Sequence, residues 1–347
     1  MRQVEKVSPT SLHLWETDRD GFFEKYLADY KTPREPQSGA MAVGSAFDAF
    51  VKCALHHHLF GNEGGDFITR EGVNTGIGIY NLKRLFEEQV DNPEIRPWAW
   101  EAGKYCFDCY VTWGVYGELL RELQTSDEDP RFEFTLQGEV NGVPLLGKPD
   151  LWYKRGIQVI YDWKVMGYCS KSSQSPKKFY KGCRDCWGMD RGKATRGGGG
   201  LKSHKGYKEI DHHGHAIGEH YLEEVDKRWA DQISIYSWMM GVAPGDDTMV
   251  SGLDQLACKP APDPEKNRNP LIRVAQHRCR ISKEWQDKLV ARLTNMWAGL
   301  QSGHIFDDLS REDSDARCEV MDMQQPVDET DEDALFWSMM NEREYRG

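Results

Sequence analysis

The chain has 347 residues, 39% of them hydrophobic and 11% aromatic, and a formal net charge of -12 at pH 7. This length suits one large domain with insertions or two small ones, and the apolar content allows a substantial core. No run approaches the roughly 18 apolar residues of a membrane span, and the N-terminus lacks the apolar stretch of a secretory signal, so we expect a soluble, cytoplasmic protein without membrane contact.

The first third of the sequence predicts helices. Residues 8–30 begin with Ser and Thr residues that can cap a helix and continue with aromatic and apolar residues at helical spacing. Residues 41–61 have apolar side chains on most sides and end at Gly61, which predicts a buried helix with a glycine C-cap. Further helices are expected over residues 79–93 and 98–123.

Strands are predicted where these helices stop. Residues 132–153 alternate between apolar and polar, with a hairpin turn at Asn141–Gly142, and residues 156–165 continue the sheet. Hydrophobic periodicity then disappears over residues 166–220, which are rich in Gly, Ser, Lys and His. We expect this segment to be a long loop inserted into the domain, without regular structure.

The last third returns to regular structure, with a helix, two strands and a further helix over residues 221–241, 248–259, 269–281 and 282–303. The order of elements predicts an α/β fold with a mixed central β-sheet flanked by helices. This domain is expected to span residues 1–305, and an acidic C-terminal extension, residues 306–347, follows it.

The hairpin "GKPDLWYKRGIQVIYDWKV", residues 147–165, carries Asp150, Asp162 and Lys164 in an otherwise apolar and aromatic pattern. Because side chains alternate along a strand, Asp162 and Lys164 share one face, while the opposite face is complete with apolar residues alone. A three-residue loop around Gly156 places Asp150 opposite Asp162, whereas a two-residue loop points the two carboxylates to opposite faces. The register therefore decides whether the carboxylates meet.

Two carboxylates a few ångströms apart repel each other unless a proton or a cation lies between them, and oxygen ligands suit Mg²⁺ or Mn²⁺. Such an ion can polarise a phosphodiester and activate a bound water, while a nearby lysine orients that water or neutralises developing charge. The alternative is a surface hairpin in which Asp and Lys make a weak contact. The first interpretation predicts phosphodiester hydrolysis.

The pattern of GKPD followed by an apolar strand and D-W-K resembles the PD-(D/E)xK nuclease superfamily, specifically its RecB-like branch, which includes many phage exonucleases. The resemblance covers residues 8 to about 300, except the insertion at 166–220. It implies a restriction-endonuclease-like core. It also implies that Asp150 and Asp162 bind metal together with the main-chain carbonyl of Trp163, and that Lys164 is the catalytic lysine.

Two further motifs of that branch have counterparts in this chain. "SPTSL" is followed by "GSAFD", in which Asp48 stands where the branch has a histidine and keeps a group able to bind metal. "DQISIYSW" supplies Gln232 and Tyr236, which share one helix face at a spacing of four residues and are expected at the active site. The alternatives are a solvated helix aspartate and a core tyrosine with a polar neighbour.

The resemblance implies a Mg²⁺-dependent deoxyribonuclease, an exonuclease acting in phage-type DNA recombination or processing in the host cytoplasm. The alternative is a non-catalytic DNA-binding or assembly protein on a degenerate nuclease fold. Some members of the RecB-like branch hold an iron-sulfur cluster through one cysteine in the first helix and three near the C-terminus. The first helix of this chain lacks a cysteine and only Cys318 lies near the end, so no iron-sulfur cluster is expected. The sequence leaves open whether the chain forms a homo-oligomer or binds a recombination partner protein.

The insertion is strongly basic, with twelve Lys or Arg against three Asp or Glu between Lys164 and Ile210. Aromatic residues are interleaved with these charges, so we expect it to bind DNA, and the alternative is a solvated linker. The expected DNA-binding residues are Lys177, Lys178, Lys181, Arg184, Arg191, Lys193 and Arg196.

Nine cysteines without an export signal argue for reduced thiols or metal ligands rather than a disulfide framework. Cys183 and Cys186 in the insertion are followed by histidines, two of which would complete a tetrahedral zinc site. Cys106 and Cys109 form a second C-x-x-C pair and make a four-cysteine site the other zinc alternative. Free thiols and solvent-facing histidines remain the simpler interpretation, and the His triplet at 56–58 is expected to be a polar helix end.

Overall fold

The computed structural model describes residues 2–30, 36–61, 81–112, 114–168, 184–187, 201–203, 207–210, 216–218, 221–246, 249–258 and 272–323. The chain forms two compact units. Unit 1 comprises Met1–Arg34, Gln137–Leu146 and Lys288–Gly347, and unit 2 comprises Glu35–Leu136 and Gly147–Asp287. Residues 306–323, the start of the predicted acidic extension, belong to unit 1.

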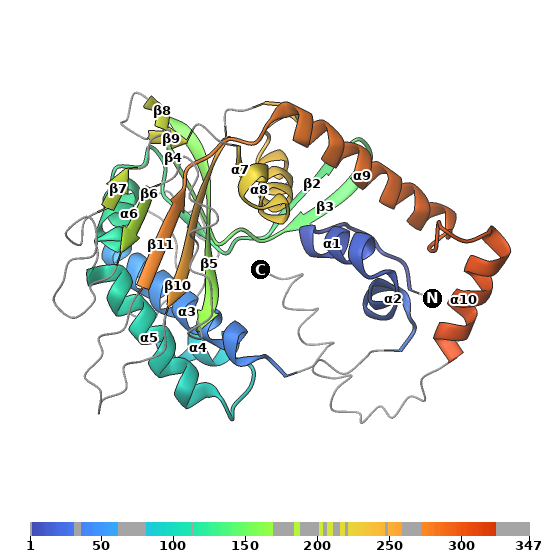
Figure 1. The fold of residues 1–347 in the computed structure, drawn as a ribbon, viewed down its shortest axis with the longest axis horizontal. Coiled ribbons are helices and arrows are strands. Elements are labelled where there is room, and N and C mark those ends of the chain that lie inside the picture. Colours follow the sequence, from blue (N-terminus) through green and yellow to red (C-terminus); the bar gives the residue numbers. More distant parts are fainter. Residues whose placement is uncertain are drawn as a thin grey trace. The chain divides into compact units, whose positions relative to one another are not determined.

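Unit 2 is built on a seven-stranded sheet with the order β1-β4-β5-β10-β11-β6-β7 (Figure 1). β5 pairs antiparallel with β4 and parallel with β10, so the predicted mixed sheet is confirmed. The strands are β1 (Arg131–Phe132), β4 (Leu151–Arg155), β5 (Ile157–Tyr168), β6 (Arg184–Trp187), β7 (Leu201–Ser203), β10 (Met249–Cys258) and β11 (Ile272–His277).

Helices flank this sheet, as the sequence predicts. The long helix α3 (Gly39–Phe60) is capped by the Ser38 side chain and ends at Gly61, whose φ of 72° is the left-handed conformation expected of a glycine C-cap. The remaining helices of unit 2 are α4 (Leu82–Gln89), α5 (Arg96–Thr112), α6 (Val115–Gln124), α7 (Leu222–Val225) and α8 (Lys227–Met239).

Two helices expected to be continuous are interrupted. The prediction of one helix over residues 98–123 is wrong, because Gly114 adopts a φ of 84° between α5 and α6. The prediction of one helix over residues 221–241 is also wrong. Asp226 has an extended backbone between α7 and α8, and its carboxylate accepts the N–H groups of Arg228 and Trp229, so it caps a new helix.

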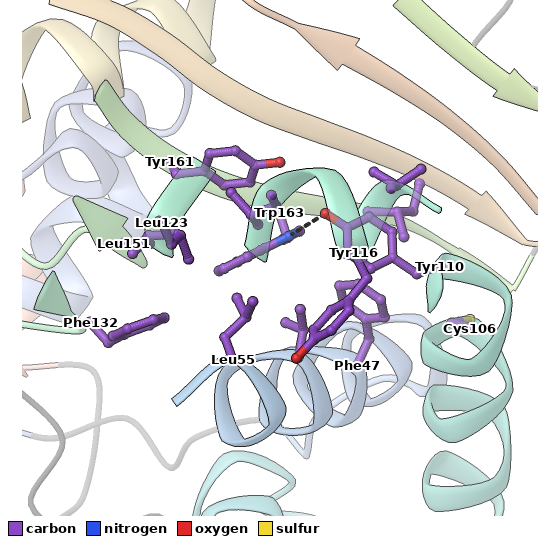
Figure 2. Packing of buried hydrophobic residues seen from close by; sticks show 14 of the residues in the cluster. Phe47, Leu55, Cys106, Tyr110, Tyr116, Leu123, Phe132, Leu151, Tyr161 and Trp163 are labelled. Atoms are coloured by element: carbon purple, nitrogen blue, oxygen red, sulfur yellow. Dashed lines mark hydrogen bonds between the residues drawn. The ribbon is translucent and has the colours of Figure 1, made fainter. Parts of the chain in front are cut away.

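The core of unit 2 lies between the sheet and the helices α3, α5 and α6. On β5 the residues that face this core are Val159, Tyr161 and Trp163, with Ile157 and Val165 packed at its margin. Figure 2 shows Tyr161 and Trp163 in one cluster with Phe47 from α3, and Trp163 Nε1 donates a hydrogen bond to Tyr110 Oη at 3.3 Å. The alternation predicted for this strand is confirmed, and Asp162 and Lys164 therefore point away from the core.

Unit 1 holds the remaining helices and a small separate sheet. Ser8 caps the first helix through a capping box with Ser11. β2 (Leu136–Val140) and β3 (Val143–Gly147) form a two-stranded sheet of their own through the predicted turn at Asn141–Gly142, and Val7 adds a parallel bridge to Leu145, so their expected place in the central sheet is wrong. The helices are α1 (Pro9–Thr17), α2 (Arg19–Phe22), the π-helix η1 (Phe23–Leu27), most of α9 (Lys283–Ser302), and α10 (Arg311–Met323).

The segment 166–220 contains regular structure that the sequence did not predict. β5 continues to Tyr168, β6 pairs antiparallel with β11, and β7 pairs with β6. A separate two-stranded sheet is formed by β8 (Tyr207–Ile210) and β9 (Ala216–Gly218). Strand pairing uses backbone groups, so a strand added at a sheet edge need not show hydrophobic alternation. The expectation of an irregular loop is wrong for these strands.

Candidate active site

The candidate site begins at the hairpin of β4 and β5, whose register is the one that the sequence required. Lys154 pairs with Gln158 and Leu151 with Tyr161, so continuing the register by one residue sets Asp150 opposite Asp162. The turn is made by Gly156, with a φ of 74°. Burial raises the pKa of the Asp162 carboxyl, and the charge of the nearby Asp150 carboxylate raises it further.

Asp162 is the centre of a group of four side chains from β5 and α8. Its Oδ2 accepts hydrogen bonds from Lys164 Nζ at 2.8 Å and from Gln232 Nε2 at 2.9 Å. Lys164 Nζ also donates to Gln232 Oε1 at 2.9 Å, and Gln232 Nε2 lies 3.2 Å from Tyr236 Oη. Gln232 thus uses both ends of its amide, which fixes the Lys164 ammonium beside the Asp162 carboxylate.

Tyr236 reaches this group because Gly147, the first residue of the GKPD motif, has no side chain. A Cβ built on Gly147 would lie 2.4 Å from Tyr236 Cε1 and 2.6 Å from Met239 Cε, closer than carbon atoms approach. Burial raises the pKa of Tyr236, so its hydroxyl stays protonated at neutral pH.

We predict that Gly147→Ala displaces Tyr236 from Gln232 and lowers stability by about 1–3 kcal/mol, the usual range for overpacking. Thermal unfolding measures the loss. Gly117→Ala is the matched control, because the nearest atom to its added Cβ lies 3.9 Å away. Equal melting temperatures for Gly147→Ala and the wild type would contradict the close packing of Tyr236 on Gly147.

A second group of acidic side chains surrounds Lys52, one helical turn after Asp48 on α3. Lys52 Nζ lies 2.5 Å from Asp48 Oδ2, 2.5 Å from Glu133 Oε1 and 3.0 Å from Asp150 Oδ1. The Lys52 side chain has no solvent exposure. Gln89 Nε2 donates to Asp48 Oδ2 at 2.8 Å and to Glu133 Oε1 at 3.2 Å, which ties α4 to the same cluster. Asp150 thus belongs to both groups.

Glu133 is a site residue that sequence reasoning missed. It lies between Phe132 and Phe134, with a φ of 44° that is uncommon for any residue with a side chain. Its N–H donates to the Asp150 carbonyl at 3.1 Å, which holds this conformation in place. The sequence signal that could have identified Glu133 is its place between two phenylalanines. An acidic residue between two core residues suggests a buried carboxylate with a partner.

Burial and mutual repulsion shift the pKa values of these carboxylates. Burial raises the pKa of Asp48 to about 8, with Lys52 acting against it and Asp150 and Glu133 adding to it. For Glu133 burial acts in the same direction, but the ammonium groups of Lys52 and Lys148 outweigh it and hold the pKa at about 2. Burial raises the pKa of Asp162 to about 7; Lys164 opposes this and Asp150 reinforces it. Without a metal, the excess negative charge is therefore relieved by protonation of Asp48 and Asp162.

Oxygen atoms of Asp48, Glu133 and Asp150 lie within 4.8 Å of one another, close enough to hold a metal ion. Asp162 is not a member of this set and lies opposite Asp150 in the hairpin register. For Trp163, expected to offer its carbonyl, the described contact is a long one from its N–H to Asp150 Oδ2, at 3.4 Å. The donors are carboxylate oxygens without sulfur or imidazole, which is the chemistry that Mg²⁺ and Mn²⁺ prefer.

We predict that Asp162→Asn stabilises the metal-free chain at neutral and alkaline pH. An asparagine can accept from Lys164 and Gln232 with its oxygen and donate to Asp150 with its nitrogen. The folded-state pKa of Asp162, about 7, lies above its ordinary value of 3.8, so this carboxyl makes the wild type lose stability as pH rises between these values, and the variant lacks that contribution.

Melting temperatures in EDTA check this prediction. The gap between Asp162→Asn and the wild type should widen from pH 4 to pH 8, by the equivalent of about 2–4 kcal/mol, and Mg²⁺ should raise only the wild-type value. Asp108→Asn, at an exposed aspartate paired with Lys104, controls for the loss of one charge. A gap that stays constant with pH would contradict the assigned charge repulsion.

The other predicted site residues fall into two classes. Most of the residues predicted in the insertion lie outside the described residues: Lys177, Lys178, Lys181, Arg191, Lys193, Arg196, Cys183 and the five histidines. For Arg184 and Cys186 the backbone is described, in β6, but not the side chains, and the same holds for Cys109 in α5. Cys106 is a buried member of the core. The DNA-binding and zinc predictions thus stay predictions.

The His triplet at 56–58 is only partly the polar helix end that was expected. His56 is fully buried, and burial lowers its pKa to about 3, so it is neutral. His57 is exposed, and the ring of His58 lies 2.7 Å from Tyr116 Oη. The prediction of a polar helix end is therefore wrong for His56, which packs in the core beside Phe132.

Comparison with models of known protein families, with curated proteins and with solved structures finds no match to this chain. Among the described residues, no helix has the length and apolar character needed to cross a membrane. Function has to be inferred from the arrangement of the residues themselves.

Proposed function

We propose that the chain is a metal-dependent deoxyribonuclease that hydrolyses phosphodiester bonds. The observation that carries the proposal is the position of Asp150 opposite Asp162 in the hairpin, with Lys164 held beside Asp162 by Gln232. Four of the five residues that the sequence singled out, Asp162, Lys164, Gln232 and Tyr236, form one hydrogen-bonded group from a strand and a helix about 70 residues further along the chain, and the fifth, Asp150, lies opposite Asp162 in the hairpin. The proposed PD-(D/E)xK core, with its restriction-endonuclease-like fold, accounts for this convergence.

Asp150 and Asp162 are the residues that would hold Mg²⁺ or Mn²⁺, together with the Trp163 carbonyl that the resemblance implies. A divalent ion bound there would polarise the scissile phosphate and lower the pKa of a bound water. Asp48 and Glu133 contribute through Lys52, which both contact.

Lys164 has the position of a group that acts on the reacting atoms. Its ammonium has three hydrogens, and Asp162 and Gln232 accept two of them. The third can donate to a phosphate oxygen or to the attacking water. Since charge on the phosphate oxygens grows in the transition state, a preorganised ammonium stabilises that state more than the bound substrate. Gln232 prevents the ammonium from rotating away, and Tyr236 fixes the Gln232 amide.

We further propose that the enzyme is an exonuclease in phage-type DNA recombination or processing, on the strength of the resemblance to the RecB-like branch. The competing hypothesis is a non-catalytic DNA-binding protein on a degenerate nuclease fold. A degenerate site would be expected to lose at least one member of a group that has no other use. The hydrogen-bonded arrangement of Asp162, Lys164, Gln232 and Tyr236 favours the enzyme.

Incubation with linear and circular, single- and double-stranded DNA, in Mg²⁺ or in EDTA, tests the proposal. Chelator-sensitive cleavage that Asp162→Asn abolishes is expected, and an RNA substrate checks the choice of nucleic acid. Cleavage of linear but not circular DNA would support an exonuclease. Binding of DNA without cleavage in any metal would reject the enzyme in favour of the non-catalytic protein.

A further inference from the structure

The Lys52 ammonium lies among three carboxylates whose arrangement could also hold a metal ion. It lies within 3.0 Å of oxygen atoms of Asp48, Glu133 and Asp150, and these three carboxylates approach one another closely enough to share one metal ion. An ion at their centre would need the space in which the Lys52 Nζ atom lies. The ammonium and a metal ion therefore exclude each other at this point.

Asp150 divides its two oxygens between the two groups. Its Oδ1 contacts Lys52 at 3.0 Å, and its Oδ2 lies 3.4 Å from the Trp163 N–H, which follows Asp162 in β5. Oδ2 of Asp162 is already used by Lys164 and Gln232. In these described contacts, neither Lys52 nor Lys164 uses Asp150 Oδ2 or Asp162 Oδ1, which are therefore the oxygens of this pair left for a divalent ion.

Displacement of Lys52 by a metal ion would be costly. The side chain is completely buried on α3, so an ammonium that left the three carboxylates would lose its partners without reaching water. A buried charge without a partner costs several kcal/mol. Asp150 and Lys164, in contrast, have side chains that are 27% and 25% exposed, so an ion that binds beside Asp162 displaces no buried ammonium.

We infer that Lys52 serves as a permanent cation in place of a second metal ion, so that the chain binds a single divalent ion between Asp150 and Asp162. The inference rests on the proposed function, since it assigns the number and place of that enzyme's metal ions. Lys52 is a positioning residue, because it acts through Asp150 and does not reach the substrate side. Asp48 and Glu133 are then partners of Lys52 rather than metal ligands.

The number of Mn²⁺ ions bound per chain tests this assignment without reference to activity. Equilibrium dialysis with electron paramagnetic resonance detection counts bound ions in four proteins at a free Mn²⁺ concentration that saturates the wild type. The expected counts are one for the wild type, none for Asp162→Asn, two for Lys52→Met, and one for the double variant. In Lys52→Met the two ions share the Asp150 carboxylate and should show spin coupling.

Different results overturn different claims. A count of one for Asp162→Asn would place the ion among Asp48, Glu133 and Asp150 and refute the inference. This variant keeps a side chain of the same shape, so the test remains possible if Lys52→Met does not fold. A count of one for folded Lys52→Met would also refute it, because removal of the ammonium would then have opened no site. No binding by the wild type would refute the proposed metal-dependent nuclease itself.

Discussion

Replacing Lys164 with methionine is expected to lower Mg²⁺-dependent DNA cleavage by at least about 100-fold while the chain stays folded. Methionine keeps the length and apolar stem of lysine and removes only the ammonium. The phosphate would then lose a donor that Asp162 and Gln232 hold at 2.8 and 2.9 Å. The loss should appear in kcat rather than in KM, because the contact is strongest in the transition state.

Measuring Mn²⁺ affinity distinguishes a catalytic role of Lys164 from a structural one. Lys164 lowers the pKa of Asp162, so it competes with a metal ion for the same carboxylate. Lys164→Met should therefore bind Mn²⁺ at least as tightly as the wild type while its cleavage is lost. A variant that lost both properties together would indicate that Lys164 only supports the fold of the site.

Lys154→Met is the matched control within the same hairpin. Lys154 is partly exposed, at the opposite end of β4, and contacts Glu128 at 3.1 Å. Surface ion pairs of this kind contribute about 0–1 kcal/mol. Cleavage by Lys154→Met should equal that of the wild type. An equal decrease in both variants would contradict a specific role of the Lys164 ammonium in cleavage.

The part of the site that the sequence predicted depends on short-range geometry. The spacing of Asp150 and Asp162 around Gly156 left two registers open, of which the structure has the one that sets them opposite each other, and alternation along β5 separates the charged face from the core. The spacing of Gln232 and Tyr236 likewise follows from helix geometry. Each of these relations holds within a single hairpin or a single helix, where the spacing of two residues determines whether their side chains point to the same face.

The part that the sequence did not predict depends on contacts between distant segments. Lys52 meets Glu133 across 81 residues and Asp150 across 98, and no periodicity encodes either approach. Lys52 also stands on the buried side of α3, where a lysine in an apolar pattern is easily taken for a surface residue. The strands β6 and β7 were missed for a related reason, because edge pairing with β11 needs only backbone groups.

Replacing Lys52 with methionine is expected to destabilise the metal-free chain by about 3–5 kcal/mol, the usual cost of removing one partner from a buried ion pair. Asp48, Glu133 and Asp150 would keep their positions around a side chain that carries no charge. Protonation can relieve part of the repulsion, so the loss should be larger at pH 9 than at pH 5. Denaturant unfolding in EDTA at the two pH values measures it.

A double-mutant cycle with Glu133→Gln isolates the Lys52–Glu133 contact. Glu133→Gln alone should destabilise the chain less than Lys52→Met does, because Lys52 keeps Asp48 and Asp150 as partners. The double variant should be more stable than the sum of the two losses predicts, since removing the carboxylate lessens the repulsion that the missing ammonium leaves behind. Strict additivity would mean that Lys52 and Glu133 do not interact in solution.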